Sequence, residues 1–270
     1  MRTLVSLTLP LLLTLGACGE LGNASDTQPA LAADIDAGIA DVQIPDRTAT
    51  PDAPSSGAYT YRFGSYNDVD AAVDAATPCF DCLNSIEALV QETTDGSCPR
   101  ITDIDKHLVE ITGGCVTAGL VEFEGSMVID RRTADEVLTT YDHFAIRTDR
   151  GTFEARGSYL YAELDMGFNA SFKLSYTWEM GTERDGSFGY DLEVVNDGDA
   201  SMIVGEVGVE AGTFAIDLSA ARVEGCEIEP VANVALFGKD EALMVLDGDK
   251  TCDACGELSF DGGEPHIVCQ

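Results

Sequence analysis

The sequence predicts a mainly β fold: a large antiparallel meander that forms a curved or barrel-like sheet, with a sandwich as the alternative, and one or two short N-terminal helices. Beyond residue 98, apolar and polar residues alternate with a period of two, as in strands with one buried face. Short turns rich in Asp and Gly separate these stretches and favour neighbouring antiparallel strands. A sheet of roughly ten or more strands has to curl, close or divide to protect its edges.

Residues 1–17 form the first segment, which has the features of an export signal. Arg2 precedes an apolar run of about a dozen residues, too short for a membrane-spanning helix but typical of a signal-peptide core. The run ends in Leu15-Gly16-Ala17-Cys18, which resembles the lipobox of bacterial lipoproteins. This resemblance implies cleavage before Cys18, acylation of its thiol, and anchoring in the membrane through the lipid. An ordinary secretory signal is the alternative, and both interpretations export the protein.

The two residues after Cys18 are Gly19 and Glu20. In lipoproteins of this type, Asp directly after the Cys signals retention at the inner membrane. The resemblance therefore implies the bacterial outer membrane, on its periplasmic or cell-surface side.

Residues 18–57 are predicted to be an acidic tether rich in Pro and Ala. Their acidic residues face a single basic one, Arg47, so the segment is expected to stay extended and solvated. A flexible chain of this length reaches roughly 35 Å. Docking of Ile35 to Ile44 as a strand or helix is the alternative.

Residues 58–97 are predicted to be helical. Asp68 is suited to cap a helix over Val69 to Ala76, which Pro78 ends. A second helix begins near Pro78 or Asp81, because apolar residues recur at helical spacing after that point. These residues are Leu83, Ile86, Leu89 and Val90.

The antiparallel β domain is predicted to occupy residues 98–270. Its clearest strand runs from Ser171 to Met180, where every second residue is apolar. Asp149-Arg150-Gly151 indicates a hairpin turn, and Gly125 is expected at an inward position. Further alternating stretches lie near 121–129, 144–146, 153–166, 188–194 and 203–218, and strands are expected near 222–229, 233–238 and 242–247.

The chain has nine cysteines. With Cys18 assigned to the lipid, an even number remains, which in an exported chain indicates disulfides whose pairing the sequence leaves open. The disulfide candidates are Cys79, Cys82, Cys98, Cys115, Cys226, Cys252, Cys255 and Cys269.

Two CxxC motifs offer alternatives to structural disulfides. Cys79 and Cys82 lie at a predicted helix start, where a reactive thiolate is stabilised. No strand of a thioredoxin-like unit precedes them, however, and Asp81 disfavours a thiolate. With Cys252 and Cys255 they could bind zinc, but the two motifs are much farther apart than in zinc modules. Structural disulfides are the favoured interpretation, and no metal site is predicted.

Acidic turns could bind Ca²⁺, and the best are Asn196-Asp197-Gly198-Asp199 and Asp247-Gly248-Asp249. Neither has the Glu of an EF-hand loop, so ordinary turns are favoured. The three histidines, His107, His143 and His266, form no HExxH motif, and GxSxG is absent. His143 is expected to face solvent and His266 to pack near a disulfide. No catalytic residue or cofactor is predicted.

The formal net charge is −33. Nucleic acid is excluded as a partner, because phosphate binding requires clustered Lys and Arg. Such a charge also favours disorder, but an apolar fraction of 45% and the regular alternation indicate a folded core.

Cys98-Pro99, Thr112-Gly113-Gly114-Cys115 and the Cys-rich ending from Leu246 resemble patterns in acidic envelope lipoproteins of myxobacterial type. Those proteins are uncharacterised, so the resemblance supports export and a β-rich fold without adding a function. The favoured hypothesis is a lipid-anchored, non-catalytic binding or structural surface module, whose protein or small-ligand partner is unknown. The alternatives are an exported enzyme, either a thiol–disulfide redox protein using Cys79 and Cys82 or a hydrolase with an unrecognised site, and a Ca²⁺-dependent adhesion module.

Overall fold

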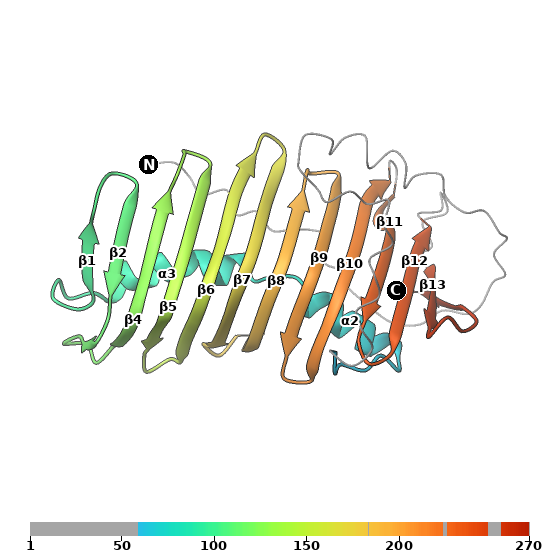
Figure 1. Ribbon diagram of the computed structural model, residues 1–270, viewed down its shortest axis with the longest axis horizontal. Helices are drawn as coiled ribbons and strands as arrows, with labels where there is room; N and C mark the ends of the chain where they lie inside the picture. Colours follow the sequence, from blue (N-terminus) through green and yellow to red (C-terminus); the bar gives the residue numbers. More distant parts are fainter. Residues whose placement is uncertain (1–58, 183, 224–225, 248–254, 270) are drawn as a thin grey trace.

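The computed structural model describes residues 59–182, 184–223, 226–247 and 255–269, apart from the side chains of residues 223, 226–229 and 247. Its strands lie side by side in one layer, and two helices run across one face of that layer (Figure 1). We call the face that the helices cover the inner face and the opposite one the outer face. Within these residues, no helix combines the length and apolar character needed to cross a bilayer.

The strands form one open antiparallel meander of fourteen strands. In chain order they are β1 (Arg100–Asp103), β2 (Leu108–Thr112), β3 (Cys115–Val116), β4 (Glu122–Arg131), β5 (Glu136–Arg147), β6 (Thr152–Leu164), β7 (Gly167–Glu179), β8 (Gly186–Asn196), β9 (Ala200–Val209), β10 (Gly212–Val223), β11 (Cys226–Phe237), β12 (Glu241–Asp247), β13 (Cys255–Phe260) and β14 (His266–Cys269). Neighbours in the chain are neighbours in the sheet, except that β2 pairs with β4 and the short β3 pairs with β4 alone. β1 and β14 are the two edges, so in the described residues the sheet neither closes on itself nor divides into a sandwich. The predicted mainly β antiparallel fold is confirmed.

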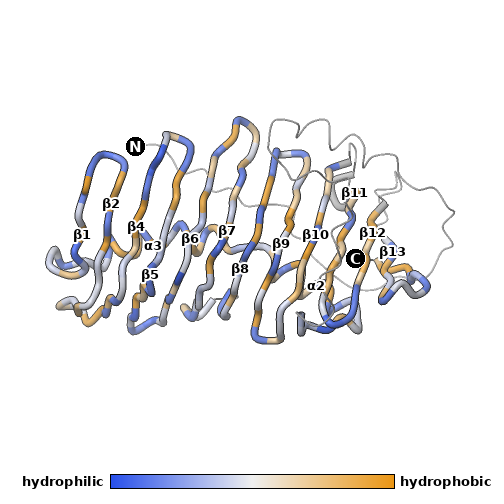
Figure 2. The backbone as a smooth tube through the Cα atoms, in the orientation of Figure 1, coloured by the Kyte–Doolittle hydropathy of each residue, from blue (hydrophilic) through white to orange (hydrophobic). Residues whose placement is uncertain are grey.

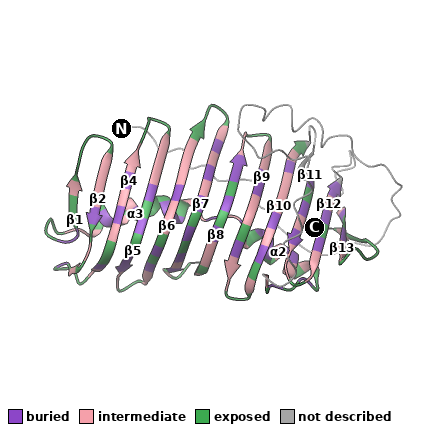
Figure 3. Ribbon diagram, viewed as in Figure 1, coloured by how far each residue is buried: buried purple, intermediate pink, exposed green. Residues whose placement is uncertain are grey.

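β7 shows why these residues form strands with one buried face. Phe172, Leu174, Tyr176 and Trp178 point to the inner face and are buried, whereas the residues between them are mainly polar and more exposed. Figures 2 and 3 show the same alternation of hydropathy and burial along the neighbouring strands. Each large apolar side chain that leaves water contributes about 1.5–3 kcal/mol, so burial of the inner face, on which the helices pack, stabilises the sheet.

α2 (Tyr66–Ala75) begins earlier than predicted. Its N-cap is Ser65, whose Oγ accepts a hydrogen bond from the Asp68 N–H at 3.4 Å, while the Asp68 carboxylate accepts from Ser65 Oγ at 2.8 Å. The prediction that Asp68 is the cap is therefore wrong. A Ser followed three residues later by an acidic residue forms a reciprocal capping box, and this adds one turn to the helix.

α3 (Phe80–Thr93) matches the predicted second helix. Leu83, Ile86 and Val90 are buried against the inner face, and Leu89 is partly buried there. At the start of the helix, Phe80 packs edge-on against Phe168 and Phe172 of β7, with ring centroids 5.0 and 5.5 Å apart.

Two features of β4 and β5 differ from the predicted regular alternation. Gly125, expected at an inward position, lies in a β-bulge with φ +63°. A second irregularity separates Tyr141 from Phe144 and contains His143, with φ +49°. Each bulge inserts residues that have no partner in the ladder, and sequence alternation alone does not reveal this.

The register of β6 along β7 decides which residues of β6 face the helices. Tyr159 and Tyr161 point inward, so Leu160 and Ala162 point outward, because β6 keeps one register along all of β7. Near the C-terminus, the strands expected at 222–229 and 233–238 are the end of β10 and a single long β11.

Candidate functional site

The structure places six of the eight disulfide candidates in bonded pairs. These pairs are Cys79–Cys82, Cys98–Cys115 and Cys255–Cys269. Cys18, Cys252 and the side chain of Cys226 lie outside the described residues. The two CxxC motifs therefore have different arrangements: Cys79 and Cys82 bond to each other, whereas Cys255 bonds to the last strand.

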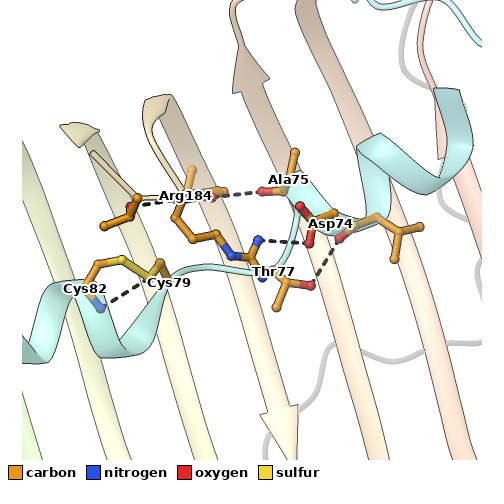
Figure 4. A network of polar contacts seen from close by, with 9 residues as sticks. Asp74, Ala75, Thr77, Cys79, Cys82 and Arg184 are labelled. Carbon is orange, nitrogen blue, oxygen red and sulfur yellow. Dashed lines mark hydrogen bonds and ion pairs between the residues drawn. A yellow bond between two sulfur atoms is a disulfide. The ribbon is translucent and has the colours of Figure 1, made fainter. Parts of the chain in front are cut away.

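The Cys79–Cys82 disulfide joins the N-cap of α3 to its first turn, beside the α2–α3 connection, and polar contacts fix this region to the sheet (Figure 4). Arg184, from the β7–β8 turn, reaches the Asp74 carboxylate at 2.9 Å. The Tyr190 hydroxyl donates a hydrogen bond to the Ala75 carbonyl at 2.9 Å. Cys82 is nearly buried. This setting supports a structural bridge that holds the helix junction, and the redox alternative stays a prediction that thiol chemistry can test.

The buried tyrosines beneath the helices have a structural role. Burial raises the pKa of Tyr141 and Tyr190 well above the ordinary value of a phenol. It also raises the pKa of Tyr159 and Tyr176. These phenols therefore stay protonated at neutral pH and serve as neutral hydrogen-bonding groups.

The histidines lie apart from one another in the fold. His107 is exposed next to a turn, and His143 is exposed as predicted, with Nδ1 2.8 Å from Asp142. His266 is exposed on β14, so the expectation that it packs near a disulfide is wrong.

The acidic turn after β8 is stabilised by its own backbone. The Asn196 and Asp197 side chains accept hydrogen bonds from N–H groups two and three residues ahead, as ordinary Asx turns do. In the second acidic turn, residues 248–249 are outside the described residues. Ca²⁺-dependent adhesion stays a prediction.

The outer face of the sheet carries a shallow groove of about 630 Å³ that crosses the strands from β4 to β9. Its floor consists of small side chains that point away from the helices. They are Ala145, Ser175, Thr177, Ser187, Gly189 and Gly208. β5 and β9 are four strand spacings apart, so the floor is about 19 Å long. The groove is open along this length, and its shape suits an extended segment.

Charged side chains form the rim of the groove. Arg147 bonds to Glu124 at 2.7 Å and to Glu154 at 2.6 Å, and these bonds raise its pKa. Arg156 projects from the middle of β6 on the groove side, is exposed, and has no ion pair or hydrogen bond within the described part of the chain. Its guanidinium can therefore bind a carboxylate supplied by another segment.

Two glycines on the groove floor are not required by the local backbone. Gly189 and Gly208 are paired across β8 and β9, and neither has a left-handed φ. A Cβ built on Gly189 has its nearest neighbour at 4.0 Å, and one built on Gly208 at 3.7 Å. By contrast, a Cβ on Gly205, three residues before Gly208, would collide with the Asp191 carbonyl.

A glycine inside a strand destabilises it by roughly 0.5–1 kcal/mol relative to Ala. Glycine there often marks a place where a ligand or another backbone comes close. Because a Cβ atom at Gly189 or Gly208 would meet only ordinary van der Waals contacts, we interpret these glycines as keeping the groove floor low.

The sequence analysis did not identify this groove. The signal that could have found it is a pair of glycines at outward positions of two adjacent predicted strands. Comparison with protein-family models, with curated proteins and with solved structures gave no match for this chain.

Proposed function

We propose that this protein is a lipid-anchored, non-catalytic binding module of a bacterial envelope, and that it binds its partner in the outer-face groove. Cys18 supplies the lipid anchor at the outer membrane, and residues 18–57 carry the domain away from the membrane. The resemblance of residues 15–18 to a lipobox supports the anchor, and the disulfides are typical of an oxidising compartment.

The observation that carries the binding role is the groove floor at Gly189 and Gly208. Both positions leave room for a Cβ atom, yet both are glycine, and the resulting hollow crosses several strands. A sheet face that serves only as a solvated surface gains stability from larger residues at such positions. The guanidinium of Arg156, which is unpaired among the described residues, adds a specific polar contact for a bound segment.

In-cell photocrosslinking tests this proposal. A photoreactive amino acid with a short diazirine side chain, chosen because it raises the groove floor little, replaces Ser175, an exposed serine of the groove that makes no side-chain hydrogen bond among the described residues. The matched control places the same amino acid at Asn233, an exposed outer-face residue of β11 away from the groove. We expect ultraviolet light to yield a defined adduct of higher mass in native cells from position 175 and none from position 233. The proposal is wrong if position 175 gives no adduct or if both positions give the same ones.

A further inference from the structure

We infer that the acidic segment preceding Tyr59, with Asp52 at its head, binds in the outer-face groove of its own chain and pairs with Arg156. This inference rests on the groove proposed above as the binding site, and adds its regulation: an external partner has to displace a segment that is already tethered there.

The first described residues lie at one end of the groove floor. The Tyr59 hydroxyl donates a hydrogen bond of 2.6 Å to Glu206, which points outward from β9. Thr60 Oγ1 accepts from the Thr213 N–H at 3.1 Å. Tyr61 then turns inward and packs on Phe214, with ring centroids 5.2 Å apart. Residues 59–61 therefore pass from the outer face to the inner face at the start of β10.

A single row of paired residues connects this entry point with Arg156. Thr213 pairs with Gly208, Gly208 with Gly189, Gly189 with Ser175, and Ser175 with Arg156. The row runs across β10, β9, β8, β7 and β6, which are consecutive in the sheet (Figure 1). Four strand spacings give about 19 Å from Thr213 to Arg156.

The segment before Tyr59 matches this row in length and size. Residues 53–58 read Ala-Pro-Ser-Ser-Gly-Ala, all small enough to lie over a floor of Gly and Ser. Asp52 is the first charged residue before Tyr59. Thr60 is eight positions after Asp52, and eight residue steps of an extended polyproline-type conformation reach about 25 Å. Asp52 can therefore reach the Arg156 guanidinium with some length to spare.

Tethering explains why an acidic segment can bind a protein with a net charge of −33. Long-range repulsion disfavours an acidic partner that diffuses in from solution. A segment joined by a short linker instead has an effective concentration on the order of millimolar. Local pairing with the guanidinium of Arg156, which forms no ion pair among the described residues, can then determine where the segment lies.

The test uses the purified full-length protein with the photoreactive amino acid at position 175 and no partner present. We expect intramolecular crosslinks, mapped by peptide mass spectrometry, to residues 52–58. R156D and D52R each lower their yield about fivefold, the upper range for an exposed ion pair, and D52R/R156D restores it. K173D is the matched control, because Lys173 is another exposed cation of the outer face outside the groove, and it leaves the yield unchanged.

Absence of crosslinks to residues 52–58, or a yield that the charge swap does not restore, would overturn the inference. The two proposals fail separately. An adduct with another molecule in cells, without the intramolecular crosslink in the purified protein, supports the proposed function and contradicts this inference. The intramolecular crosslink without any cellular adduct supports this inference and contradicts the proposed function.

Discussion

Filling the groove floor should stabilise the protein. In G189T/G208T, two strand positions exchange glycine for a residue with high strand propensity. Relief of the glycine cost contributes about 0.5–1 kcal/mol at each site. A Thr–Thr pair across β8 and β9 adds about 0.2–1 kcal/mol. The nearest atoms to the two added Cβ positions lie 3.7–4.0 Å away, so steric cost is small.

We therefore expect G189T/G208T to raise the free energy of unfolding by about 2 kcal/mol. For a domain of this size, that raises the melting temperature by roughly 4–8 °C. Thermal and guanidinium unfolding followed by circular dichroism measure it. G205T is the matched control, because its Cβ would collide with the Asp191 carbonyl and its φ is +139°. The G205T protein should have a free energy of unfolding more than about 2 kcal/mol below that of the wild type. A G189T/G208T protein that melts below the wild type would show that the fold itself requires these glycines and refute the reasoning.

Three further predictions concern the helix junction and the tyrosines. The folded protein should show no reactive thiol at Cys79 or Cys82. The C79A/C82A variant should lose about 2 kcal/mol of its free energy of unfolding. Removal of the Cys98–Cys115 disulfide, which closes a longer loop, should cost roughly 3 kcal/mol. A low-pKa thiol pair found by titration at 79 and 82 would instead support the redox alternative. Y190F removes the hydrogen bond to the Ala75 carbonyl and should cost about 1–2 kcal/mol in denaturant unfolding, whereas an unchanged midpoint would show that this contact does not hold α2. Burial raises the pKa of Tyr59 and of Tyr66 to about 12. Since these phenols ionise near pH 10 when unfolded, their contribution to stability is complete below pH 10 and is lost as pH rises towards 12. Spectrophotometric titration that shows all tyrosines ionising near pH 10 in the folded protein would contradict this.

The strands with one exposed face could be predicted from the sequence because one face contacts apolar side chains and the other contacts water. In β7, each apolar residue from Phe172 to Trp178 lies where alternation placed it. The apolar stripe of α3 could be predicted for the same reason, since Leu83, Ile86 and Val90 share one helix face. In both elements the pattern is local and repeats several times.

The features that the sequence did not reveal depend on register. A bulge at Gly125 or at Asp142 and His143 changes which face later residues occupy, although the residues themselves alternate normally. The outward position of Leu160 likewise follows from the register of β6 along β7. The groove arises in the same way, because only the register brings Arg156, Gly189 and Gly208 into one row.

The central claim is that the groove is the binding site, and the most direct measurement is the cellular crosslink from position 175 in G189T/G208T. Threonine side chains raise the groove floor while the fold is preserved and stabilised. We predict that the high-mass adduct formed by the protein with its native glycines disappears in this variant, at equal protein abundance. An adduct of undiminished yield in the filled variant would contradict the account, because binding would then not depend on the hollow that Gly189 and Gly208 keep open.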